Sequence, residues 1–141
     1  MAISYNTVNV PFPKIKRRVT TKWVYLVIEK YYKKPGAINY IFCSDEEILR
    51  INKQYLNHDY YTDIITFDYS ENEIISGDLF ISLDTVKSNS EKFDTVYEEE
   101  LCRVMIHGIL HLCGFKDKTS VDGKIMREKE NEALNLLKNE F

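Results

Sequence analysis

The sequence predicts an α+β fold, in which a small mixed four-stranded sheet is packed by about five helices. Two observations lead to this class. Short stretches rich in β-branched and aromatic residues alternate with helical patterns in the first half of the chain, and helical patterns dominate the second half. The length of 141 residues, with 44% apolar and 29% charged residues and no internal repeat, fits a single globular domain spanning 1–141.

The chain is expected to begin with a strand, a helix and a second strand. Residues 3–8 alternate in character and predict a short strand, and a helix follows from about Lys14 to Lys34. Pro35 and Gly36 are expected to end that helix, because proline removes a backbone donor and glycine permits a turn. The aromatic and β-branched stretch at 37–43, AINYIFC, then predicts a strand.

Ser44 is expected to cap the next helix, which runs to about Asn57. The serine side chain can accept a backbone hydrogen bond, and acidic residues follow in the first turn. Two further strands are expected at 62–69 and 77–83, separated by a polar connection. The chain ends in an amphipathic helix that begins near residue 122.

A helix expected from about Tyr97 to Cys113 carries two of the three histidines. Residues four apart on a helix differ by about 40° around the axis and ~6 Å along it, so His107 and His111 share a face. Gly114 can end the helix in a left-handed turn, and Asp117 can then fold back as a third ligand. Three ligands with an open fourth position are the layout of a catalytic zinc site, so we predict one tightly bound divalent metal ion per chain.

Other interpretations of this motif are weaker. Zinc proteases with such a helix carry glutamate directly after the first histidine, whereas this chain has Gly108. Cys113 is a poor ligand candidate, because it lies about 160° around the helix from His111. Asp117 stands between two lysines and is open to interpretation as an ordinary surface residue.

Charge and cysteine content limit the class of protein. The net charge of −3 does not by itself favour nucleic acid, but residues 14–34 hold eight basic residues and one acidic residue. Lys16 and Arg17 in this segment are candidate phosphate-binding residues, although a solvated helix face explains the pattern equally well. Three irregularly spaced cysteines, with no secretion signal or membrane span, predict a cytoplasmic protein with no membrane partner.

Three sequence blocks resemble the YbeY family of bacterial endoribonucleases. These are HGILHLCGFKD at 107–117, LRINKQYLNHDYYTDIITFDY at 49–69 and GDLFISLDTV at 77–86. The resemblance implies a metal-dependent, single-strand-specific endoribonuclease that acts in 16S rRNA 3′-end maturation and ribosome quality control. It also implies single-stranded RNA, 16S rRNA and the small ribosomal subunit as partners, and zinc held by His107, His111 and the residue at 117.

Two positions depart from the family pattern. Asp117 stands where the family has a third histidine, and a carboxylate lowers the net charge of the site by one. Leu56 stands where the family has an arginine that would serve the phosphate. His58, two residues further on, is a candidate replacement and a candidate catalytic residue, or else a surface histidine.

The second block supplies further candidates. Asp59 and Thr62 match the family block and are expected to border the substrate cleft. Asp63 is the candidate general base. The alternative for Thr62 and Asp63 is a structural role, in which they cap and orient the strand that follows.

Two other functions are compatible with the sequence. An atypical metallopeptidase would use the same two histidines, but the missing glutamate counts against it. A non-catalytic ribosome-associated factor would use the metal to stabilise its fold, and Leu56 in place of arginine favours this alternative.

Overall fold

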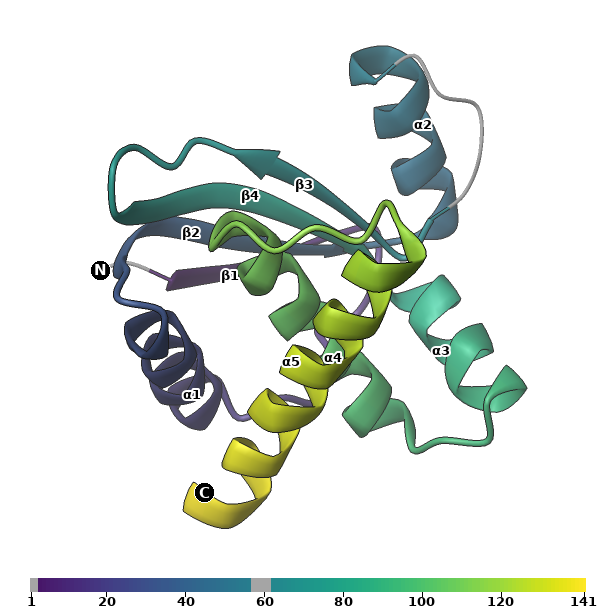
Figure 1. The fold of residues 1–141 in the computed structure, drawn as a ribbon. Helices are drawn as coiled ribbons and strands as arrows, with labels where there is room; N and C mark the ends of the chain where they lie inside the picture. Colours follow the sequence, from purple (N-terminus) through teal and green to yellow (C-terminus); the bar gives the residue numbers. More distant parts are fainter. Residues whose placement is uncertain (1–2, 57–61) are drawn as a thin grey trace.

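The computed structural model describes residues 3–56 and 62–141, which form a four-stranded sheet and five helices (Figure 1). The predicted α+β class is therefore confirmed. In chain order the elements are β1 (Ile3–Val8), α1 (Arg17–Lys30), β2 (Lys34–Cys43), α2 (Asp45–Tyr55), β3 (Ile64–Asp68), β4 (Ile74–Ser82), α3 (Leu83–Lys92), α4 (Tyr97–Leu112) and α5 (Ser120–Glu140).

The sheet is mixed, with the strand order β1-β2-β4-β3. Strand β2 pairs in parallel with both β1 and β4, whereas the edge strand β3 pairs antiparallel with β4. Parallel neighbours need a crossover connection, and α1 supplies it between β1 and β2. This antiparallel pairing places Ile64, at the start of β3, opposite Ile81 near the end of β4.

Helices pack on both faces of the sheet. Helices α1 and α4 pack on one face, and α5 packs over them (Figure 1). The Trp23 indole N–H of α1 donates to the Ala133 carbonyl oxygen of α5 at 2.7 Å. Helix α2 packs on the opposite face, where Ile48 and Ile51 meet Cys43 and Ile65. The larger core lies under α1 and α4 and includes Ile38, Tyr40, Phe42, Leu79, Ile81 and Met105.

The first helix ends earlier than the sequence predicts. Helix α1 stops at Lys30, and Tyr32 adopts a left-handed backbone with φ of 61°. Pro35 and Gly36, which were expected to stop the helix, lie inside β2. The pairing of β2 with β4 shifts register between Pro35 and Ile38, so the strand absorbs the Pro-Gly pair as an irregularity.

One helix has no counterpart in the elements placed from sequence. Helix α3 follows β4 directly, and the Ser82 hydroxyl oxygen accepts from the Thr85 backbone N–H at 3.2 Å. The last helix also starts two residues before position 122, because Thr119 caps it by accepting from the Asp122 N–H at 3.0 Å. Both helices begin at a short polar N-cap residue that was not predicted from the sequence.

The cysteines lie at the hydrophobic cores. Cys43 is buried, Cys102 and Cys113 are partly buried, and all three are free thiols packed at the hydrophobic cores. No helix within 3–56 and 62–141 is long and apolar enough to cross a membrane.

Candidate metal centre

The close approach of α4 to the sheet explains the glycine beside the first histidine. A Cβ at Gly108 would lie 2.8 Å from Ile64 Cδ1 and 3.0 Å from Leu79 Cδ2. Position 108 therefore faces β3 and β4, whereas His107 and His111 line a hollow together with Asp117. A glutamate at position 108 would face the core and could not act as the base that a protease of this type requires.

The glycine turn after α4 returns the chain to the histidines. Gly114 has φ of 108°, its N–H donates to the His111 carbonyl at 3.0 Å, and the Phe115 N–H donates to the Leu110 carbonyl at 3.0 Å. These bonds satisfy carbonyls at the end of the helix. The Phe115 ring packs edge-on against Tyr31 with centroids 5.0 Å apart, which anchors the returning segment that carries Asp117.

Three candidate ligand atoms converge, one from each residue that the sequence predicts to hold the metal. Asp117 Oδ2 lies 3.2 Å from His107 Nε2 and 3.4 Å from His111 Nε2. One ligand atom from each residue lies within 4.8 Å of the others. Ligand bonds of about 2.0–2.1 Å in a tetrahedral zinc site give ligand-to-ligand separations of about 3.3 Å. The donor set and its spacing therefore fit a divalent metal ion.

A buried carboxylate from α5 holds the first histidine. His107 Nδ1 lies 2.7 Å from Glu130 Oε2, and Arg103 donates to Glu130 Oε1 at 2.9 Å. Glu130 is only 5% exposed. A carboxylate at Nδ1 places the proton on that nitrogen, so the Nε2 lone pair faces Asp117 and would be available to a metal ion. Sequence reasoning missed Glu130, although it interrupts the apolar face of α5 between Met126 and Ala133.

The electrostatics of these groups are coupled. Burial lowers the pKa of His107, but the Glu130 hydrogen bond and the nearby Asp63 and Asp117 carboxylates outweigh it, so the pKa is raised overall. Burial raises the pKa of Glu130, but hydrogen bonds from His107 and Arg103 outweigh burial and lower it. Glu130 is therefore a carboxylate at neutral pH, as a partner of a metal-ligating histidine should be.

Asp63 lies at the same centre. Burial raises the pKa of its carboxyl group, and the charge of His107 partly opposes that rise. The Asp63 carbonyl oxygen accepts from the Ser82 N–H at 2.9 Å, so the end of β4 fixes the position of its backbone. A carboxylate with a raised pKa beside a candidate metal centre has the properties of a proton-transfer group.

These groups open into a hollow of about 520 Å³ between α2, β3 and the end of α4. Leu56, at the position where the YbeY pattern has arginine, also faces this hollow, and the exposed Lys118 adds a cation at its rim. The lining residues are Asn52, Leu56, Thr62, Asp63, Ile64, Ile65, Thr66, Asp68, His107, His111, Asp117 and Lys118.

The predicted phosphate-binding residues Lys16 and Arg17 line other hollows. Arg17 lies on α1 with its guanidinium carbon 4.0 Å from the Phe12 ring centroid, and it lines a different hollow near β1. Lys16 lines another hollow beside the start of α1. Their predicted role in binding RNA stays a prediction for a surface apart from the metal centre. His58 and Asp59 lie outside the described residues.

Comparisons with known proteins match the same family that the histidine motif resembles. The sequence model of a family described as Endoribonuclease YbeY matches residues 3–138. A Bacteroides fragilis protein with that description is 60% identical over 138 residues, covering 98% of this chain and 99% of that protein. A Porphyromonas gingivalis protein with the same description is 53% identical, covering 96% of this chain and 89% of that protein. The solution structure of a Thermotoga maritima protein is 28% identical with a TM-score of 0.68, covering 98% of this chain and 90% of that chain.

Proposed function

Because the chain belongs to the family described as Endoribonuclease YbeY, we propose that it is a zinc-dependent endoribonuclease that cuts single-stranded RNA. We place its action in 16S rRNA 3′-end maturation and ribosome quality control, with the small ribosomal subunit as partner and the cytoplasm as location. The observation that carries the proposal is the convergence of His107 Nε2, His111 Nε2 and Asp117 Oδ2 at an open hollow.

The proposed metal ligands are His107, His111 and Asp117. A bound divalent ion would act as a Lewis acid toward a phosphoryl oxygen and lower the pKa of a water molecule toward about 7. Glu130 fixes the tautomer of His107, so that its Nε2 lone pair faces the centre before any ion arrives. Asp117 returns over α4 because of the Gly114 turn.

Asp63 is the proposed proton-transfer residue. It lies in the same hollow as the ligands, and its raised pKa places it closer to neutral pH than an exposed aspartate. In this role the Asp63 carboxylate accepts a proton from the attacking water, and its carboxyl form returns one to the leaving oxygen. Thr62 donates to Asp63 Oδ1 at 3.5 Å, a long contact that steadies the carboxylate.

Leu56 supplies no positive charge to this hollow, so another residue has to contact the substrate phosphate. Lys118 is the proposed phosphate partner, since it is exposed at the rim and directly follows the ligand Asp117. The peptidase alternative is disfavoured, because Gly108 is packed against Ile64 and Leu79 and leaves no position there for a catalytic glutamate.

Metal content and cleavage measured together test the proposal. The purified protein is analysed for bound metal and incubated with an unpaired RNA and with the same sequence in a duplex, before and after chelation. We expect cleavage of the unpaired strand, loss with chelator and recovery with added zinc. His111→Ala should lose metal and activity together, while Cys113→Ala, on another side of α4, should keep both. A folded, metal-loaded protein that leaves unpaired RNA intact would favour the non-catalytic ribosome-associated alternative.

A further inference from the structure

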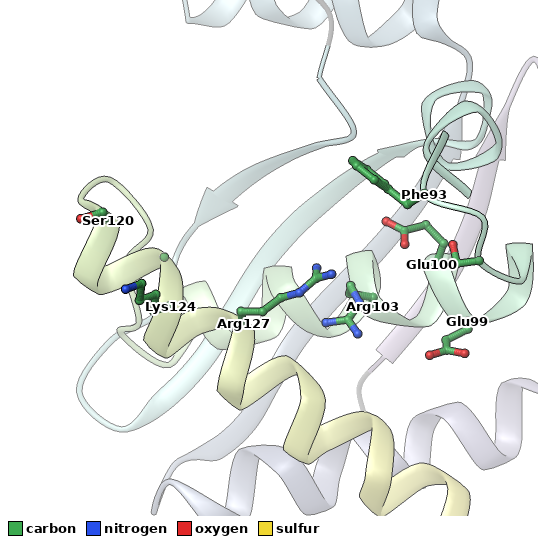
Figure 2. Close-up of a pocket in the computed structure, with 9 residues that line it drawn as sticks. Phe93, Glu99, Glu100, Arg103, Ser120, Lys124 and Arg127 are labelled. Atoms are coloured by element: carbon green, nitrogen blue, oxygen red, sulfur yellow. The ribbon is translucent and has the colours of Figure 1, made fainter. Parts of the chain in front are cut away.

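A second hollow, of about 540 Å³, lies between α4 and the start of α5 (Figure 2). Its walls come from the connection between α3 and α4, the first half of α4 and the first turns of α5. Arg103 lines it and also donates to Glu130, which holds the ligand His107. Hydrogen bonds through Glu130 therefore connect the wall of this hollow to the metal centre.

One end of this hollow pairs an aromatic ring with a carboxylate. Phe93 is 60% exposed, and its side chain lies beside that of Glu100 (Figure 2). The Lys92 ammonium lies over one face of the ring, 5.5 Å from its centroid, which leaves the other face for a planar partner. An exposed aromatic ring at the edge of a hollow is a stacking surface for an unpaired base.

Glu100 is the carboxylate at this end. Burial raises its pKa, the charges of Arg103 and Arg127 lower it, and the carboxylates of Asp63 and Glu130 raise it. Within residues 3–56 and 62–141, burial and nearby charges shift this pKa, and no hydrogen bond contributes to the shift. A partly buried carboxylate in these surroundings gains most from a ligand that donates to both of its oxygens.

The opposite wall is basic and lacks one side chain. Lys124 and Arg127 line it from α5, and the Arg127 side chain is 64% exposed, with its nearest ion-pair contact to Glu130 at 3.7 Å. Gly123 lines the same wall, and a Cβ there would have no atom within 4 Å. Glycine inside a helix costs about 1 kcal/mol relative to alanine, and packing does not require it at this position. A side chain at this position would project into open space.

We propose that this hollow binds a guanine nucleotide of the RNA strand, close to the phosphate that is cut. Glu100 accepts from N1–H and the N2 amino group, Phe93 stacks on the base, and Arg127 with Lys124 holds a phosphate. The assignment rests on the proposed endoribonuclease function for its substrate class, and it adds a base preference that the metal centre alone does not provide.

Guanine fits the carboxylate better than the other bases do. It presents two neighbouring donors on its Watson–Crick edge, and one carboxylate can accept both. Adenine and cytosine place a donor next to an acceptor, and uracil places its single donor between two acceptors, so each offers Glu100 fewer bonds. A bidentate contact of this kind discriminates against the wrong base by roughly five- to 150-fold.

The spacing agrees with a base near the scissile phosphate. Glu100 precedes His107 by seven residues on the same helix, which corresponds to about 10 Å along the axis. Arg103 lies between them, and both ends of its guanidinium are held, by Glu130 and by Asn131 at 2.9 Å each. Arg103 is therefore a positioning residue that keeps the wall of this hollow rigid, and Arg127 is the cation that faces a ligand.

Nucleotide binding tests the inference without relying on cleavage. The ¹⁵N-labelled full chain is titrated with 5′-GMP, 5′-AMP, 5′-CMP and 5′-UMP and followed by NMR. We expect GMP to bind roughly five- to 150-fold more tightly than the others and to shift the backbone amides of Gly123 and Arg127. Glu100→Gln should abolish the preference for GMP, and Phe93→Ala should weaken binding of every nucleotide. Glu98→Gln, in the same turn of α4 but lining a different hollow, is the matched control and should bind like the unmodified chain.

Two further arms separate this inference from the proposed function. His111→Ala should keep its preference for GMP, because the hollow does not include the metal ligands. Selective GMP binding by a protein that cuts no RNA would overturn the endoribonuclease and leave the guanine site standing. In cleavage mapping, inosine in place of the guanine beside the cut should slow cleavage, because it lacks the N2 amino group. Equal binding of the four nucleotides, or GMP shifts confined to other residues, would overturn the guanine site.

Discussion

Replacing Glu130 with glutamine tests how the metal centre is held. Both oxygens of Glu130 are acceptors, Oε2 for His107 Nδ1–H at 2.7 Å and Oε1 for Arg103 at 2.9 Å. Glutamine has the same shape but only one acceptor oxygen, so Glu130→Gln leaves either the imidazole or the guanidinium facing an amide donor. Glu130 is 5% exposed, so solvent cannot easily replace the lost bond.

The substitution Glu130→Gln should lower both the free energy of unfolding and the metal affinity. A buried donor without a partner costs about 1–3 kcal/mol, so the free energy of unfolding of the metal-free protein should fall by that amount. Losing the carboxylate partner of a ligating histidine lowers metal affinity by roughly 10–100-fold. Glu128→Gln is the matched control, because Glu128 is exposed on the same helix.

Two assays separate positioning from stability. Competition with a coloured chelator measures zinc affinity, and urea unfolding measures stability in the absence of metal. Both quantities should fall in Glu130→Gln and remain unchanged in Glu128→Gln. If Glu130→Gln unfolded more easily but bound zinc as tightly as the unmodified protein, Glu130 would be a structural residue and the tautomer argument would be refuted.

Three other predictions concern the same centre. Asp117→His replaces a charged ligand with a neutral one, so a variant that still binds zinc should show its activity profile shifted to lower pH; an unchanged or higher midpoint would contradict the charge argument. Gly108→Glu should destabilise the fold by about 3 kcal/mol or more in urea unfolding and yield no peptidase activity, since the side chain would press on Ile64 and Leu79. In the metal-free protein, NMR titration should give His107 a pKa above its usual value. Protons should therefore compete with zinc, and zinc binding should weaken as the pH falls through that raised pKa. A pKa below the usual value would mean that the effect of burial outweighs that of Glu130.

Local sequence patterns predicted the parts of the site that lie close together in the chain. The four-residue spacing of His107 and His111 and the helix-ending Gly114 are local features, and the structure places Asp117 beside both histidines. The strands were likewise predicted from short β-branched and aromatic stretches, with their ends displaced by a few residues. Local rules work here because each depends on the geometry of one helix, strand or turn.

The partners that depend on tertiary packing could not be predicted in this way. Glu130 reaches His107 only because α5 crosses α4, and no local pattern specifies that crossing. Gly36 was interpreted as a helix stop because proline and glycine disfavour helices, but pairing with β4 draws that segment into a strand. The basic segment around Arg17 was expected to contribute to substrate binding, whereas α1 packs against β2 and Arg17 lines a hollow beside β1, apart from the hollow of the metal centre.

The most direct test of the central claim is a zinc titration of the metal-free protein, with bound metal and cleavage of an unpaired RNA measured on the same samples. Activity should rise in proportion to bound zinc and reach its maximum at one ion per chain, held by His107, His111 and Asp117. Full activity in protein that contains no metal, or a maximum that persists in His111→Ala, would contradict a catalytic metal centre at these three residues.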